Sequence, residues 1–261
     1  MKSGISRVCS ITRLLFCITA GLSLIGAGSV TKADDTAYMA TGGGAFGTID
    51  LTTGVFTQLG LSQLPVMGLA VKGTTMYGAG AGNNNQNGQL WSVDPANGNL
   101  TAIGQPTGID YQAFGSLNDT LYAIDHNSAN PNLYSIDSST GAATLIGPLN
   151  IGPLAGYWSL SNNSTALYFQ LNSTLYTLNT TTGQASPVGL LSSQLQLQAG
   201  AMVEVNGTLY AGQDNTSAAS LEVLVRQPKS SMMYSPSIRL PLSGRSQSIL
   251  FVQVRLQDPS A

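Results

Sequence analysis

Residues that usually carry catalysis or hold metals are scarce in this chain. Its 261 residues include one histidine, two cysteines and two tryptophans. Both cysteines, Cys9 and Cys17, lie within the first 33 residues, so the remainder has neither a disulfide nor a Cys/His cluster for zinc. No G-x-S-x-G elbow occurs, and GGGAFG (42–47) reads as a hairpin loop that leads into no helix. We therefore expect no metal and no cofactor, and no motif indicates an enzyme.

Basic residues are nearly absent from the middle of the chain. Residues 34–225 carry one base, Lys72, against eleven acids, whereas residues 226–261 carry five bases and one acid. Nucleic acids and anionic membranes attract basic surfaces, so the acidic middle region argues against both as partners. Its surface must instead be covered by Ser, Thr, Asn, Gln and Gly.

A hydrophobic run long enough to span a membrane is missing as well. The apolar run from Leu14 to Ala27 is too short for a spanning helix and follows three basic residues, Lys2, Arg7 and Arg13. This pattern predicts that residues 1–33 are a secretory signal peptide. We expect a secreted or periplasmic protein with no membrane span after the leader is cleaved.

What the chain does contain is a repeat of 42 to 46 residues. Its most regular part reads GTIDLTTG (47–54), LWSVDPANG (90–98), LYSIDSSTG (133–141) and LYTLNTTTG (175–183). The aligned residues Asp50, Asp94, Asp137 and Asn179 recur after 44, 43 and 42 residues. We expect each of these side chains to accept hydrogen bonds from N–H groups of its turn, and the closing glycine to supply a positive φ.

Each repeat reads as four short strands. The turn joins an outer pair of strands, a strand centred on a tyrosine precedes this pair, and a further apolar stretch such as AMVEVN (201–206) comes first. A period of this length made of short strands is typical of β-propeller blades. The sequence therefore predicts an all-β fold, a β-propeller of about five four-stranded antiparallel blades over residues 34–225.

The ends of the repeat region are irregular. The first blade lacks its first strand, which the C-terminal part of a propeller commonly supplies, so that no sheet edge is left free. Residues 226–261, however, lose the repeat: RQPKSS (226–231) replaces the expected turn. Two interpretations remain open. This tail supplies the last strands of a divergent blade, or a reading-frame change near residue 220 has made it non-native.

Few polar residues are candidates for a binding site. Glu204 lies in a predicted innermost strand, and Asp110 and Asp125 lie in loop types that face one end of a propeller. Two roles are open for these carboxylates: they approach one another, as paired carboxylates do in glycosidases, or they are three separate, solvated residues of loops and the channel rim. His126, the only histidine, follows Asp125; it is either a solvated loop residue or part of the same site.

Three aromatic residues complete the candidate ligand-binding set. Tyr111, Tyr157 and Trp158 precede or open the predicted innermost strands of blades three and four. Aromatic rings at a loop end can stack on sugars or flat ligands, and packing between blades is the alternative role.

The LYxID-xxTG-xxTxIG pattern, as in LYSIDSSTGAATLIG (133–147), resembles secreted bacterial β-propeller-like proteins of the YVTN/quinoprotein-like superfamily. The resemblance covers about residues 36–225 and implies an exported protein of uncharacterised function. Such proteins often end in a sorting motif with an apolar span and a basic tail, which this chain lacks. Quinone-binding propellers carry tryptophan-rich docking motifs, whereas only Trp91 and Trp158 occur here, so that cofactor is not expected.

Two functions are consistent with these observations. The first is an exported, non-enzymatic propeller that binds a glycan, peptide or protein, or acts as a surface or matrix component. The alternative is a carboxylate-dependent hydrolase or lyase with its site at the mouth of the propeller channel.

Overall fold

The computed structural model describes most of the repeat region. It describes residues 36–41, 44–51, 53, 55–62, 66–80, 87–126, 129–154, 156, 158–190, 201–205, 208–213, 220–226, 232–234, 238–239 and 249–252. The expected signal peptide, residues 1–33, and the candidate residue Tyr157 lie outside the described residues.

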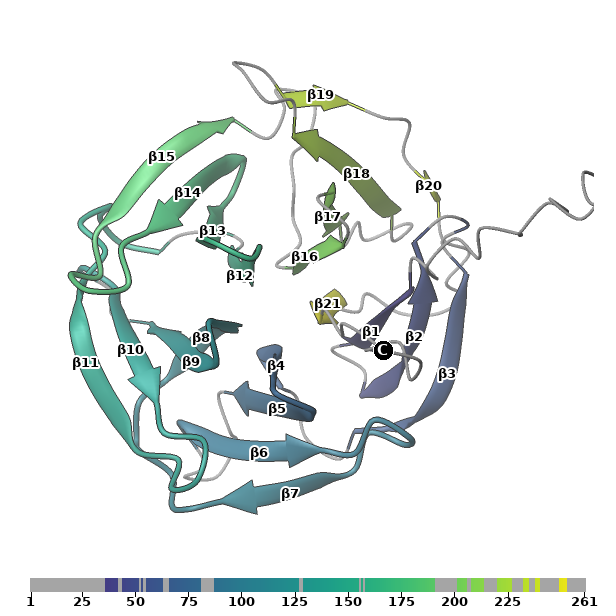
Figure 1. Ribbon diagram of the computed structural model, residues 1–261, viewed down its shortest axis with the longest axis horizontal. Helices are drawn as coiled ribbons and strands as arrows, with labels where there is room; N and C mark the ends of the chain where they lie inside the picture. Colours follow the sequence, from purple (N-terminus) through teal and green to yellow (C-terminus); the bar gives the residue numbers. More distant parts are fainter. Residues whose placement is uncertain are drawn as a thin grey trace, which may run out of the picture. The chain divides into compact units, whose positions relative to one another are not determined.

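The described residues form only β-strands, loops and turns (Figure 1). Twenty-one strands make five antiparallel sheets that lie around a ring within one compact unit, Asp35–Ala261. This arrangement is a β-propeller and confirms the predicted fold class. About five four-stranded blades were expected; four sheets have four strands, whereas the fifth has five because β20 also pairs with β18. No helix in the described part of the chain is long and apolar enough to cross a membrane.

The blades follow one another along the chain, and each is named here by its strands from the innermost outward. Blade one contains β21 (Ile249–Val252), β1 (Thr36–Thr41), β2 (Ala45–Asp50) and β3 (Phe56–Leu61). Blade two contains β4 (Gly68–Lys72), β5 (Thr75–Gly80), β6 (Gln89–Val93) and β7 (Leu100–Ile103). Blade three contains β8 (Tyr111–Leu117), β9 (Thr120–Asp125), β10 (Asn132–Ile136) and β11 (Ala143–Pro148).

The last two blades have the same order of strands. Blade four contains β12 (Trp158–Asn162), β13 (Leu167–Leu171), β14 (Thr174–Leu178) and β15 (Ala185–Leu190). Blade five contains β16 (Ala201–Val205), β17 (Thr208–Gln213), β18 (Ser220–Arg226) and β19 (Met232–Tyr234), with β20 (Ile238–Arg239) beside β18.

The ring is closed by the C-terminal strand β21. It pairs with β1 in antiparallel register, with Thr41 opposite Ile249 and Tyr38 opposite Val252. It also contacts the innermost strands of blades five and two, β16 and β4, and lies among the innermost strands near the centre of Figure 1. β21 therefore occupies the position of the first strand that the sequence of blade one lacks.

The repeated turn has the predicted hydrogen bonds. In blade three the backbone N–H groups of Ser139 and Thr140 donate to Asp137 Oδ1 over 2.8 and 3.0 Å. The closing Gly141 has a φ of 73° and donates its N–H to the carbonyl oxygen of Asp137 over 2.8 Å. Asn179 accepts the equivalent bonds in blade four, which explains why Asn replaces Asp there.

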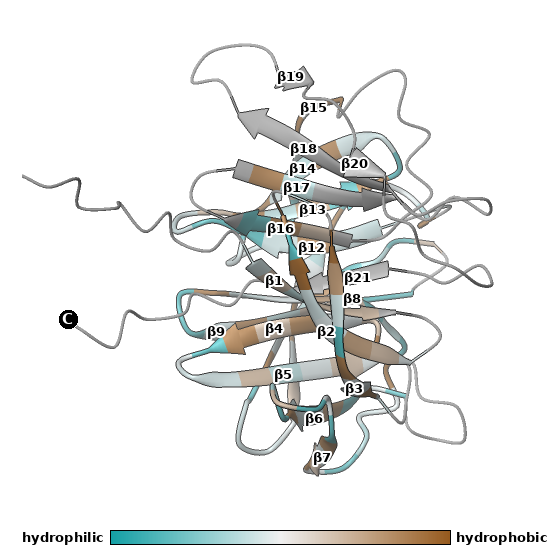
Figure 2. Cartoon of the chain, turned by 90° about the vertical axis from the view of Figure 1, so that its right-hand side faces the viewer, coloured by the Kyte–Doolittle hydropathy of each residue, from teal (hydrophilic) through white to brown (hydrophobic). Residues whose placement is uncertain are grey.

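The core lies between facing sheets, because an isolated blade would leave both of its faces in water. Between blades three and four, Ile124, Leu133 and Leu149 pack in one buried cluster with Leu160 and Phe169. Figure 2 shows the strands coloured by hydropathy, with apolar segments in brown on β4, for example. The fully buried Gln170 is hydrogen-bonded: it accepts from Ser159 Oγ and donates to the carbonyl oxygen of Asn172.

A glycine at the outer edge of blades one, two and three allows the next blade to pack closely. The turn of blade three lies so near Gly104, after β7, that a Cβ there would overlap the carbonyl oxygen of Thr140. Gly147 in β11 meets the carbonyl oxygen of Thr182 in blade four in the same way. The glycine of each TxIG segment is thus required by the turn of the following blade.

Candidate functional site

The two ends of the ring differ in which loops they carry. Gly68 in β4 packs against Phe114 in β8, and the N–H of Gly73 donates to Asp119 Oδ1 over 3.3 Å. The first residue of β4 thus lies beside β8, and the residue after β4 lies beside a residue further along the chain, after β8. The strands β4 and β8 therefore run in the same direction. We call the end where the innermost strands begin the mouth, and the end where they turn into the next strand the turn end.

At the mouth of blade three, Asp110 and His126 lie side by side. Asp110 directly precedes β8 and His126 directly follows β9, and the strand ends that they flank are paired, with Tyr111 opposite Asp125. The N–H of His126 donates to the carbonyl oxygen of Asp110 over 2.8 Å. Their side chains meet as well: His126 Nδ1 lies 3.5 Å from Asp110 Oδ2, with relative exposures of 43% and 38%. This contact is long for a hydrogen bond and is strengthened when the imidazole is protonated.

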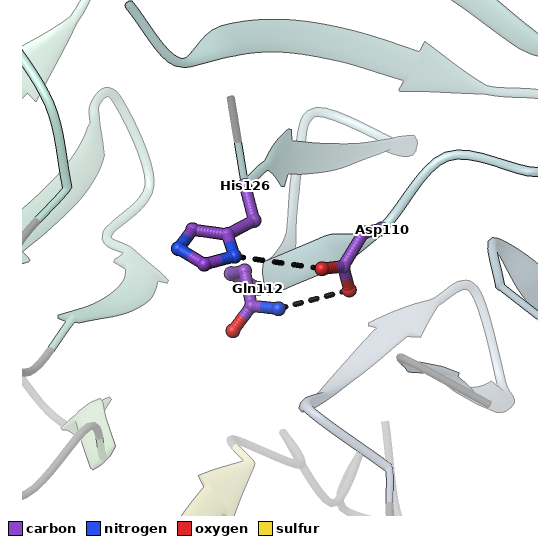
Figure 3. A network of polar contacts seen from close by, with 3 residues as sticks. All are labelled: Asp110, Gln112 and His126. Carbon is purple, nitrogen blue, oxygen red and sulfur yellow. Dashed lines mark hydrogen bonds and ion pairs between the residues drawn. The ribbon is translucent and has the colours of Figure 1, made fainter. Parts of the chain in front are cut away.

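Gln112 bonds to the other oxygen of the same carboxylate. Its Nε2 donates to Asp110 Oδ1 over 2.9 Å, and the amide and the imidazole lie next to each other on one side of the carboxylate (Figure 3). The register of β8 against β9 shifts between Tyr111 and Ala113, which leaves Gln112 as the extra residue of a β-bulge. Bulges redirect a side chain and are frequent beside functional sites. The strand alternation of the sequence gave no sign of this bulge, and Gln112 was not among the predicted residues.

Trp158 brings the next blade into the site. It is the first residue of β12, and its ring centroid lies 5.8 Å from that of His126 with the planes tilted by 33°. The indole is only partly buried. We call Asp110, Gln112, His126 and Trp158 the mouth cluster; three of these four residues were predicted as ligand-binding candidates.

Asp125 has a different role from Asp110. It is 8% exposed, and its carboxylate accepts hydrogen bonds from the Asn132 N–H (2.7 Å), Asn132 Nδ2 (3.0 Å) and the Tyr134 hydroxyl (3.1 Å). These bonds connect the end of β9 to β10. Burial, together with the neighbouring Asp125 carboxylate, raises the pKa of Tyr134 to about 12. The carboxylate of Asp125 is thus engaged within its own blade.

Tyr111 supports the loop that carries Asp110. It is 1% exposed, its ring packs 6.4 Å from that of Tyr134, and its hydroxyl accepts a hydrogen bond from Thr107 Oγ1 over 3.2 Å. Burial raises the pKa of this hydroxyl. The Tyr111 side chain packs between blades two and three, in one cluster with Leu90 and Phe114, which is the alternative role considered for it.

Glu204 lies towards the opposite end of the ring. It is the fourth residue of β16, opposite Leu209 and next to the turn into β17, whereas Asp110 precedes the first residue of β8. Since the blades repeat one topology, the structure does not bring Glu204 to the mouth with Asp110 and Asp125. Whether the three carboxylates meet depends on which end of the ring each strand end occupies. The residue pattern does not reveal this.

The mouth cluster offers hydrogen-bonding groups beside an aromatic ring. Asp110 orients both Gln112 and His126, and the imidazole Nε2 has no partner in the part of the chain that the structure describes. Within the same described residues, no group of three or more His, Cys, Asp or Glu could hold a metal ion. The cluster can therefore bind a polar ligand with a flat apolar face, or transfer a proton at His126.

Comparison with known proteins supports the fold. No family model matches the sequence, and no curated protein matches it. Among solved structures, a chain from the crystal structure of a nidogen/laminin complex aligns with a TM-score of 0.53 and 15% identity, over 84% of this chain and 81% of that one. A protein from Lactobacillus plantarum aligns with a TM-score of 0.44 and 14% identity, over 80% and 69% of the two chains. At these identities the first likeness shows the fold alone.

Proposed function

We propose that this protein is an exported, non-enzymatic β-propeller that binds an extracellular partner through the mouth cluster. The observation that carries the proposal is the cluster itself: a pre-arranged set of polar groups beside a partly exposed indole, built from two neighbouring blades. Polar groups beside an aromatic ring suit a binding site, and pre-arrangement reduces the ordering cost of binding.

Two further observations support this role. The first 33 residues have the sequence of a secretory leader. The nidogen/laminin structure places a chain of similar fold in a complex with another protein. A role in a surface or matrix of secreted material agrees with both, as does the resemblance to exported bacterial repeat proteins.

Binding arrays test the proposal. The full chain, produced with its own leader and purified after export, is applied to glycan and peptide arrays beside three variants: Trp158→Ala, Gln112→Ala and Gln58→Ala. Gln58 is an exposed glutamine on the outermost strand β3 and serves as the matched control. We expect array signals that both mouth variants lose and the control retains. Signals that all variants retain, or no signal from the wild type, would contradict the proposal.

The alternative is a hydrolase or lyase at the same mouth. It is favoured by one observation, the carboxylate of Asp110 beside Nδ1 of His126, since such a carboxylate orients an imidazole for proton transfer. Turnover of ester, glycoside or polysaccharide substrates that disappears in His126→Gln, while Gln58→Ala keeps it, would establish this function in place of the first.

A further inference from the structure

The chemistry of the mouth cluster also indicates which class of ligand it takes. We infer that the ligand is a neutral saccharide; this inference rests on the proposed binding function and narrows it. The argument has three steps, which concern the polar groups, the indole and the charge around them.

The polar groups suit hydroxyls, which both donate and accept hydrogen bonds. Gln112 keeps its Oε1 as an acceptor and a second N–H as a donor after bonding to Asp110, and His126 keeps Nε2. The bulge in β8 and the bond to Asp110 hold the Gln112 amide in place. A ligand with several adjacent hydroxyls can use all of these groups together without reordering them.

The indole of Trp158 supplies the apolar half of the site. A sugar ring presents C–H groups on one face and hydroxyls around its edge, and an amphipathic aromatic ring beside polar side chains matches both. His126 lies 5.8 Å from the indole, so the polar and aromatic groups are within the width of one sugar ring of each other.

Charge selects against ionic ligands. Residues 34–261 carry twelve acids and six bases, and the one base of residues 34–225, Lys72, lies at the turn end of β4 and donates to Ser138 Oγ over 2.9 Å. Phosphates and uronic acids would therefore be repelled at the mouth. A cation is also disfavoured, because Gln112 and His126 already contact the Asp110 carboxylate.

Isothermal titration calorimetry provides the test, because its signal does not depend on Trp158 and the Trp158→Ala variant can therefore be titrated as well. The exported full chain is titrated with cellohexaose, xylohexaose, maltohexaose and chitohexaose. Parallel titrations use oligogalacturonate as an anion and tetramethylammonium as a cation. We expect at least one neutral oligosaccharide to bind, with about tenfold or greater weakening in both Trp158→Ala and Gln112→Ala and none in Gln58→Ala. Gln112→Ala keeps the test valid if the tryptophan variant fails to fold.

Each remaining outcome overturns the inference in a recognisable way. Binding of only the anion or the cation, lost in Gln112→Ala, would reject the saccharide and keep the proposed function. If no probe binds but the array signals still depend on the mouth cluster, the saccharide is rejected and the proposed binding function is kept. Binding of no probe and no array signal would reject both.

Discussion

At the scale of single residues, the surroundings of a side chain decide its role more than its chemical type. Asp110 and Asp125 lie at the same end of one pair of strands, yet Asp110 is 38% exposed and Asp125 is 8% exposed. Asp125 satisfies three donors of its own blade, whereas Asp110 orients two side chains of the mouth cluster. Stability and binding are thus assigned to different carboxylates, and the two assignments can be measured separately.

Replacing Asp125 with Asn should destabilise the fold by about 1–3 kcal/mol, because the new amide N–H groups would face the donors Asn132 and Tyr134 in a buried site. Asp110→Asn, at a partly exposed position, should change the free energy of unfolding by less than about 0.5 kcal/mol. Urea unfolding of both variants and the wild type measures the difference. Equal effects of the two substitutions would show that Asp125 has no special structural role.

Asp137 gives a prediction for acid pH. Hydrogen bonds from the side chain and backbone of Ser139, and from the backbone of Thr140, lower the pKa of this exposed carboxyl to about 2. A carboxyl whose folded pKa lies below its unfolded value of about 3.9 stabilises the fold above the unfolded pKa, and that contribution is lost as the pH falls towards the folded one. The stability difference between wild type and Asp137→Asn should therefore shrink between about pH 4 and pH 2. Urea midpoints at several pH values measure it, and a constant difference would contradict the assignment. Asn179 shows that Asn fits this turn.

At the scale of elements, the contacts between the outer edge of one blade and the turn of the next, which we call seams, depend on glycine. Gly104 and Gly147 leave room for the turns of the next blade, and the turns are held in shape by their own Asp or Asn. The turn chemistry could be predicted from the sequence because it involves residues close together in the chain. The contact between blades could not be predicted, because it joins the glycine of one repeat to the turn of the next. The sequence pattern shows that the glycine and the turn both recur, but not that they touch.

Gly104→Ala should cost about 2–4 kcal/mol, because its Cβ would overlap the backbone of Thr140 at a φ of 65°. Gly73→Ala is the matched control: φ there is 58°, and a Cβ would meet nothing within 4 Å. The control should cost only about 1 kcal/mol, from the backbone conformation. Thermal and urea unfolding of the two variants separates the cost of the overlap from the cost of the backbone conformation. Equal losses of unfolding free energy would show that the neighbouring turn shifts to make room for the Cβ.

Prediction from the sequence was strongest for the architecture and weakest for the site. The period and the short alternating strands gave the propeller, and the positions of Asp110, His126 and Trp158 in their repeats placed them at loop ends. The expected approach of Glu204 failed because neighbouring innermost strands run in the same direction. Gln112 was missed because a bulge adds one residue to a strand without changing its composition.

At the scale of the whole molecule, the ring depends on residues that no longer follow the repeat. After β18 the sequence has no TG turn like those of the earlier blades. Closure of the ring relies on β21, which pairs with β1 and contacts β16 and β4.

Truncation after Gly244 should open the ring, because it removes β21 and exposes the inner edge of β1. We expect the truncated protein to aggregate in light-scattering measurements and to be cut rapidly by trypsin. In the full chain, Arg226 and Arg239 lie in paired strands and should resist cleavage. Early cleavage at these arginines that leaves a stable, monomeric core would instead favour the non-native tail.

The pairing of β21 with β1 also sets an order of events during biogenesis. β1 lies at the start of the first blade, and its inner neighbour is synthesised only after all the other blades. The ring cannot close until β21 has been made, so the inner edge of β1 in the first blade stays unpaired until then. In the exported protein that we propose, pairing of β21 is therefore the last step of folding.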